Sequence, residues 1–89
     1  YPNPFNPSTW IPFVLGKESH VVIHIYNDMG QVVRTFDLGT RKPGSYISEG
    51  RAVYWDGMNS QGESVASGVY LCEIRTHNVV AVRRMLLIK

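Results

Sequence analysis

The chain has 89 residues, a net charge of +2, 44% hydrophobic residues and one cysteine. A chain of this length is expected to fold as a single domain, residues 1–89, with one modest core and little material for a deep substrate cleft. The weak, scattered positive charge excludes a nucleic-acid footprint, the lone cysteine excludes an internal disulfide, and the apolar runs are far shorter than the roughly 20 residues that cross a bilayer.

A proline-rich lead-in occupies residues 1–8. Pro2, Pro4 and Pro7 remove backbone donors and hold the residues before them in extended geometry. We expect a stiff linker that carries the chain from a parent protein into the first strand, with Phe5 against the core. The alternative interpretation is a proline-rich ligand for an aromatic groove in another protein.

The first strand is predicted over residues 9–15. Its side chains alternate between two faces, and three large apolar residues share one of them: Ile11, Phe13 and Leu15. Pro12 has no N–H to donate to a ladder, so this strand is expected at the edge of a sheet.

The second strand, residues 20–27, shows the clearest alternation in the chain. Its core face carries three β-branched residues: Val21, Ile23 and Ile25. The spacing of His20 and His24 would suit a metal site on a helix, but on a strand four residues separate the rings by roughly 13 Å. We therefore predict two surface histidines and no metal site.

Loops divide the middle of the chain. Residues 27–30 predict a tight reversal, residues 31–36 a third strand, and residues 37–44 a loop with two glycines and a proline. Residues 45–55 predict one long strand preceded by an irregular piece around Glu49-Gly50.

The polar loop that starts at Asp56 invites a calcium interpretation. An EF-hand loop needs an oxygen ligand at its third position, Gly at the sixth and Glu at the twelfth. These positions hold Met58, Gln61 and Ser67, so the EF-hand pattern fails. A hydrogen-bonded turn is predicted instead, while a different calcium site using Asp56, Asn59 and loop carbonyls stays open.

The end of the chain predicts a tight hairpin. A strand over residues 69–76 and a last strand over residues 79–89 flank the turn His77-Asn78. Cys72 falls on the inward face of the first of these strands and is expected to be a buried, inert thiol. Arg83-Arg84 interrupts the apolar last strand, so one arginine must point to each face. The pair is either a solvated break that blunts aggregation or a recognition handle.

Together these patterns predict an all-β fold, an antiparallel β-sandwich of about seven short strands. The expected core consists of alternating apolar residues, namely Val21, Ile23, Ile25, Val33, Tyr54 or Trp55, Tyr70, Cys72, Ile74 and several of residues 80–88. The sequence holds no nucleophile elbow, phosphate-binding loop or Cys/His cluster. We therefore expect no catalytic activity, no cofactor and no metal.

Three separated motifs resemble the immunoglobulin-like domain of flagellar hook-capping proteins and the similar C-terminal sorting domains of type IX secretion. The first motif is the opening stretch Tyr1-Pro2-Asn3-Pro4-Phe5-Asn6-Pro7-Ser8-Thr9. The second is a central turn with Trp55, Asp56, Gly57, Gly62, Ser67, Gly68 and Tyr70. The third is the closing stretch Arg83-Arg84-Met85-Leu86-Leu87-Ile88-Lys89. The segment at residues 45–55 is longer than the family pattern, as local decoration or for a contact specific to the parent.

The resemblance implies an immunoglobulin-like sandwich and a role in export. Sorting domains are the C-terminal domains of larger exported bacterial proteins and are recognised by outer-membrane export machinery. They pass through the periplasm to the cell surface or the medium, and their signal lies at the end formed here by residues 83–89. The absence of a starting Met and of a signal peptide fits a C-terminal piece with its export signal upstream.

A second function hypothesis is a structural or adhesive immunoglobulin-like module that spaces or docks neighbouring domains of the parent chain. A carbohydrate-binding accessory module is a further variant, with Trp10 as the stacking residue. Both hypotheses name a partner but no cofactor, and the sequence leaves the oligomeric state open.

Overall fold

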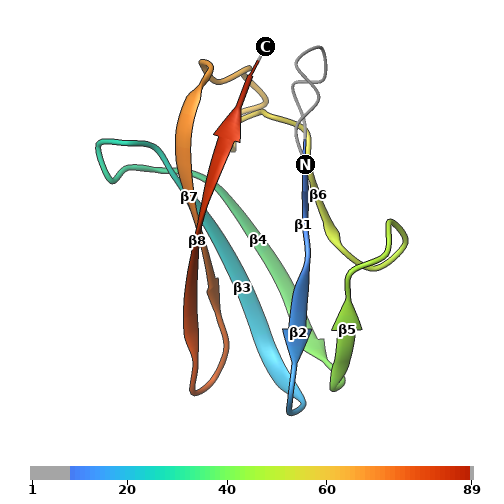
Figure 1. Ribbon diagram of the computed structural model, residues 1–89. Coiled ribbons are helices and arrows are strands. Elements are labelled where there is room, and N and C mark those ends of the chain that lie inside the picture. The colour runs from blue at the N-terminus through green and yellow to red at the C-terminus, as the bar shows by residue number, and fades with distance from the viewer. Residues whose placement is uncertain (1–8, 89) are drawn as a thin grey trace.

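The computed structural model describes residues 9–88, so the expectations for the lead-in at residues 1–8, with Phe5, and for Lys89 lie outside the described residues. The described residues form eight strands and no helix (Figure 1). The strands are β1 (Thr9–Ile11), β2 (Phe13–Leu15), β3 (Ser19–Tyr26), β4 (Val32–Arg41), β5 (Gly44–Tyr46), β6 (Val53–Trp55), β7 (Gly68–Arg75) and β8 (Val80–Leu87).

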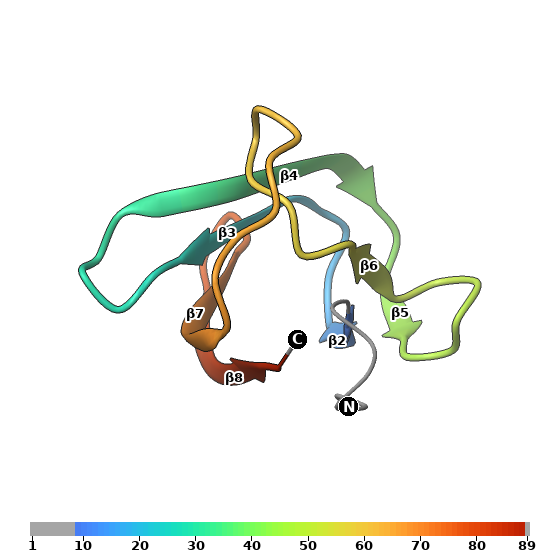
Figure 2. The same cartoon turned by 90° about the horizontal axis from the view of Figure 1, so that it is seen from above.

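The strands build two layers, and every pairing is antiparallel. One layer is a four-stranded sheet in the order β4-β3-β7-β8. The other consists of two short ladders, β1 with β6 and β2 with β5. Seen from above, the four-stranded sheet curves around the short ladders (Figure 2). The predicted all-β antiparallel sandwich is therefore confirmed.

Pro12 divides the first strand, which is a correction to the single strand predicted over residues 9–15. Ile11 pairs with Val53, and Phe13 pairs with Tyr46. Pro12 therefore stands opposite the excursion at residues 47–52, where it needs no ladder hydrogen bond. The same excursion divides the strand predicted over residues 45–55 into β5 and β6.

The predicted loop at residues 37–44 was wrong at its start, because β4 continues to Arg41. The strand passes through a β-bulge, where Val21 and Val22 of β3 pair with Gly39 and Asp37, leaving Leu38 as the extra residue. Gly39 has a φ of 68°, which glycine adopts without strain, and its N–H donates to the Asp37 carboxylate over 3.0 Å. The glycine bends the strand and does not end it.

The core lies between the layers and takes most of its side chains from the predicted faces. Its fully or nearly fully buried members are Ile11, Phe13, Leu15, Val21, Ile23, Ile25, Tyr46, Trp55, Tyr70, Cys72, Ile74 and Leu87. Trp55 occupies the core position that the sequence left open between two aromatics, and Tyr54 is 47% exposed.

Two core expectations need correction. Val33 is only partly buried, at the point where the pairing of β3 with β4 shifts register. Within residues 80–88, Leu87 is buried and Met85 partly so, whereas the other residues are exposed. The reason is that only alternate residues of β8 face the other layer, and two of these, Ala81 and Arg83, remain exposed.

Candidate functional site

The central turn begins with a buried indole. Trp55 packs edge-to-face on Tyr70, with ring centroids 5.3 Å apart and an interplanar angle of 72°. Its Nε1–H donates to the Met58 carbonyl over 2.9 Å, so the polar atom of the buried ring has a partner. This contact joins β6, the turn and β7 in one unit.

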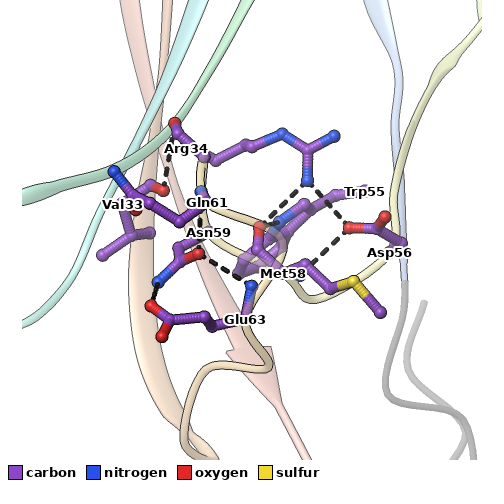
Figure 3. A network of polar contacts seen from close by, with 9 residues as sticks. Val33, Arg34, Trp55, Asp56, Met58, Asn59, Gln61 and Glu63 are labelled. Carbon is purple, nitrogen blue, oxygen red and sulfur yellow. Dashed lines mark hydrogen bonds and ion pairs between the residues drawn. The ribbon is translucent and has the colours of Figure 1, made fainter.

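Asp56 ties the turn to β4 (Figure 3). Its Oδ1 accepts hydrogen bonds from the Arg34 guanidinium over 2.8 Å and from the Met58 N–H over 3.0 Å. Arg34 also donates to the Met58 carbonyl over 3.0 Å and lies over the Phe36 ring. Burial raises the pKa of the Asp56 carboxyl, but the Met58 N–H and the Arg34 guanidinium outweigh it and hold that pKa below its ordinary value.

Asn59 closes the polar loop by bonding to its own backbone (Figure 3). Its Oδ1 accepts from the N–H groups of Gln61 and Glu63 over 3.0 and 2.9 Å, and its Nδ2 donates to the Glu63 carboxylate over 3.0 Å. The N–H of Gly62 donates to the Asn59 carbonyl, and Gly62 adopts a φ of 81°. The predicted hydrogen-bonded turn is confirmed.

The reversal at residues 27–31 has the same construction. Asn27 Oδ1 accepts from the N–H groups of Met29 and Gln31, and Asn27 Nδ2 donates to the Gln31 side chain over 2.8 Å. Gly30 has a φ of 79°. Both loops have the sequence Asn-x-x-Gly followed by Gln or Glu. This repeat is present in the sequence, but the two turns were not predicted from it as a pair.

This repeat predicts a difference between two identical substitutions. Asn59→Asp places a second carboxylate against Glu63, whereas Asn27→Asp faces the neutral amide of Gln31. We expect Asn59→Asp to lower the free energy of unfolding at neutral pH by about 0.5–1 kcal/mol more than Asn27→Asp, because exposed like charges repel modestly. Urea unfolding followed by circular dichroism measures both. Glu63→Gln added to Asn59→Asp should remove the difference, and equal losses in the two single variants would contradict the assignment.

The remaining motif residues lead the chain into β7. Gly57 has a φ of 77°, and its carbonyl accepts the Val65 N–H over 3.0 Å. Ser67 precedes Gly68, the first residue of β7. The Tyr70 hydroxyl donates to the Ala66 carbonyl over 2.5 Å. The motif thus organises the reversal that brings the chain from one layer to the other.

The hydrogen bonds of this loop do not favour the calcium interpretation. Asp56 Oδ1 and Asn59 Oδ1, two of the oxygens that would serve as ligands, each already accept two N–H bonds. No group of three or more His, Cys, Asp or Glu side chains that could hold a metal occurs in residues 9–88. His20 contacts Asp37 and His24 contacts Glu73, so the two histidines have separate partners.

The last strand presents an exposed aliphatic stripe. Val80, Val82 and Leu86 face outward on β8, and Val82 is 62% exposed. On β7 the neighbouring residues Val69 and Leu71 are also exposed and pair with Leu86 and Arg84. We call this set, Val69, Leu71, Val80, Val82, Arg84 and Leu86, the β8 surface.

The two adjacent arginines of β8 point to opposite faces, as predicted. Arg83 pairs with buried Cys72 and donates to the Pro12 carbonyl over 2.8 Å, so it links β8 to the layer of short ladders. Arg84 pairs with exposed Leu71. A small groove lies between β1 and β8, lined by residues 9–12 and 83–86, with a volume of about 200 Å³.

The structure splits the predicted recognition stretch between the two faces. Met85 and Leu87 pack inward, whereas Leu86 and Ile88 are exposed. Trp10 is 37% exposed on the outer side of β1, where its ring meets Tyr54 at a centroid distance of 4.9 Å. Residues 9–88 form no helix that could span a membrane.

Comparison with known proteins extends the resemblance. The family model of the FlgD Ig-like domain matches residues 6–78. The solved structure of FlgD from P. aeruginosa is similar with a TM-score of 0.69 and 26% identity, over 90% of this chain and 59% of that one. A part of dimeric latent PorU from Porphyromonas gingivalis has a similar fold, with a TM-score of 0.64 and 20% identity over 100% of this chain and 9% of that one.

The chain therefore spans less than two thirds of either solved relative. No curated protein matches it. The predicted immunoglobulin-like form of the sandwich is confirmed by the likeness to FlgD.

Proposed function

The chain belongs to the FlgD Ig-like domain family, and from this premise we propose that it is a non-catalytic C-terminal sorting domain of a larger exported bacterial protein. Outer-membrane export machinery recognises it while the parent passes from the periplasm to the cell surface or the medium. The recognition element is the closing stretch, residues 83–89, which begins within β8. The resemblance of the closing stretch to sorting domains supports this assignment.

One observation carries the proposal: β8 is an edge strand whose outward side chains are largely apolar. An edge strand offers a row of backbone donors and acceptors to which an extended segment of a partner can add. The β8 surface supplies side-chain contacts beside that edge, with Val80, Val82 and Leu86 as apolar anchors. Contiguous exposed apolar residues of this kind mark protein-interaction surfaces.

Arg84 provides a polar contact within the same surface. Among the described residues it has no acidic partner within ion-pair distance. Arg83 differs, because its guanidinium is held by the Pro12 carbonyl. We therefore assign recognition to Arg84 and a positioning role to Arg83, which holds β8 against the layer of short ladders.

A fusion experiment tests the proposal. Residues 1–89 are attached to the C-terminus of a periplasmic reporter in a host with type IX secretion, as wild type and with Leu86→Glu or Arg84→Glu. Point variants are preferred to a deletion of residues 83–89, because a deletion would also remove Leu87 from the core. We expect the wild-type fusion to reach the surface or medium and both variants to accumulate in the periplasm, with the melting temperature nearly unchanged because the residues are exposed.

Lys17→Glu is the matched control for Arg84→Glu, since it makes the same change of charge in an exposed turn. This control should export normally. Normal export of Leu86→Glu and Arg84→Glu would overturn the role of β8. A folded wild-type fusion that stays in the periplasm would overturn the sorting function itself.

The second candidate is a structural or adhesive module. It is favoured by the higher identity to FlgD, 26%, than to PorU, 20%. In that case the β8 surface docks a neighbouring domain or filament, and loss of the domain leaves export unchanged. The carbohydrate variant depends on the exposed Trp10 ring, and an unchanged glycan-binding signal in Trp10→Ala would remove it.

A further inference from the structure

A second surface groove lies away from β8. It opens between the end of β4 and the strands β5 and β6, and has a volume of about 680 Å³. The excursion at residues 47–52, which the two short ladders leave opposite Pro12, contributes part of its wall. No residue of β8 lines it, so its ligand is independent of the proposed sorting role.

The charged side chains that line the groove are all basic. Arg41, Lys42 and Arg51 contribute to the lining, and no Asp or Glu does. None of the three forms an ion pair among the described residues. Three of the nine Lys and Arg residues of the chain thus gather in one groove, although the net charge is only +2. A groove with this charge favours an anionic ligand.

Arg51 is held ready for such a ligand. Its guanidinium lies over the Tyr46 ring, 4.6 Å from the centroid, and the Tyr46 hydroxyl donates to the Lys42 carbonyl over 2.6 Å. The backbone of the excursion is closed by hydrogen bonds from Arg51 and Ala52 to the Ser48 carbonyl. A stacked guanidinium keeps its N–H edge free for two parallel bonds to a carboxylate.

The aromatic residues of the groove do not offer a platform for a sugar. Tyr46 is stacked on Phe13 on one side and covered by Arg51 on the other. Arg34 lies over Phe36. Tyr54 is exposed, but its ring already packs against Trp10. Stacking of a pyranose ring needs a free aromatic face, so a peptide fits these walls better than a glycan.

The backbone also favours an extended peptide. In the described sheets β4 pairs only with β3, β5 only with β2, and β6 only with β1. The groove therefore lies between strands that each have one edge outside these pairings, although the Leu38 and Lys42 carbonyls already accept hydrogen bonds from Arg41 Nε and the Tyr46 hydroxyl. One wall extends from Phe36 in β4 to Lys42, just past the end of the strand, and at roughly 3.3 Å per residue it accommodates about six residues of an extended strand.

We propose that this groove binds an extended acidic peptide segment of a partner protein, with Arg51 and Lys42 contacting its carboxylates. The alternation of a strand places every second side chain on one face. A ligand with Asp or Glu at alternate positions therefore directs all its carboxylates toward the cations.

Titration of the isotope-labelled chain with an acetylated, amidated hexapeptide of alternating Glu and Val tests the proposal. We expect amide shifts concentrated in residues 36–54 and binding that weakens with added salt. The matching Gln/Val hexapeptide should bind roughly tenfold more weakly or worse, since a charged hydrogen bond is lost.

Two variants with the same change of charge separate site binding from general attraction. Arg51→Glu should weaken binding of the Glu/Val peptide roughly tenfold or more, whereas Lys17→Glu, outside the groove, should leave it within about twofold. Equal losses in both variants, or equal binding of the Gln/Val peptide, would overturn the proposal. Tighter binding of hexagalacturonate than of the Glu/Val peptide would also overturn it, in favour of an acidic glycan.

Discussion

Trp55→Ala is expected to lower the free energy of unfolding by about 3–5 kcal/mol, the cost of removing a large aromatic side chain from a core. The indole is fully buried, packs on Tyr70 and donates to the Met58 carbonyl. Its removal leaves a cavity between the layers and takes away one of the two hydrogen bonds to the Met58 carbonyl, which keeps the bond from Arg34. Because a domain of this size is stable by only about 5–10 kcal/mol, the variant is expected to be partly unfolded at 37 °C.

Tyr54→Ala is the control, since it removes an aromatic ring one residue earlier on the same strand. Tyr54 is 47% exposed and contacts Trp10, so a loss of about 1 kcal/mol is expected. Urea denaturation followed by far-UV circular dichroism compares the two variants. Similar losses at both positions would contradict the burial of Trp55 as the central packing contact.

The Cys72 thiol is expected to react with a disulfide reagent at pH 8 at least about a thousandfold more slowly in the folded chain than in urea. Cys72 is fully buried, and burial raises the pKa of its thiol from 9.0 to about 11, although the nearby Arg83 charge opposes the shift. A higher pKa lowers the thiolate fraction roughly a hundredfold at this pH. Burial denies the reagent access and lowers the rate further, until the chain unfolds. A fast reaction without denaturant would contradict this position for Cys72.

The same shift makes folding stability depend on pH above 9. Below pH 9 the thiol is protonated in both states, so the contribution of Cys72 is fully present. Between pH 9 and 11 the unfolded chain loses its proton first, and stability falls by about 1.4 kcal/mol per pH unit from this group. Urea unfolding of wild type and Cys72→Ala at pH 8 and 10 isolates the effect, because other groups titrate in both proteins. Parallel losses in the two proteins would show that Cys72 does not contribute.

The proposed recognition surface and the acidic-peptide groove differ in how much of each could be predicted from the sequence. Residues 83–89 were marked by the resemblance of the closing stretch, and the opposite directions of Arg83 and Arg84 follow from strand alternation. Residues 45–55 were marked only as decoration or a contact specific to the parent, and the groove itself was not predicted, because Arg41 and Arg51 lie in segments predicted as a loop and as part of a strand. Their proximity depends on the excursion at residues 47–52, whose position follows from the pairing of β5 with β2 and of β6 with β1.

Local patterns determined much of this fold without any tertiary information. The core faces of β3 and β7, with Val21, Ile23 and Ile25 on the first and Cys72 on the second, follow from a period of two. The turn at Asn59 follows from side-chain bonding to its own backbone. These features depend on residues only a few positions apart, so the sequence alone is sufficient to predict them.

Tertiary structure decided the features that depend on register. Nothing local distinguishes Trp55 from Tyr54, since either face of an isolated strand could point inward, and Gly39 could end a strand or bend it in a bulge. The bond from Arg83 to Pro12 joins residues 71 positions apart. Such contacts form only once whole strands are paired, because the register of a pairing decides which face every side chain of a strand occupies.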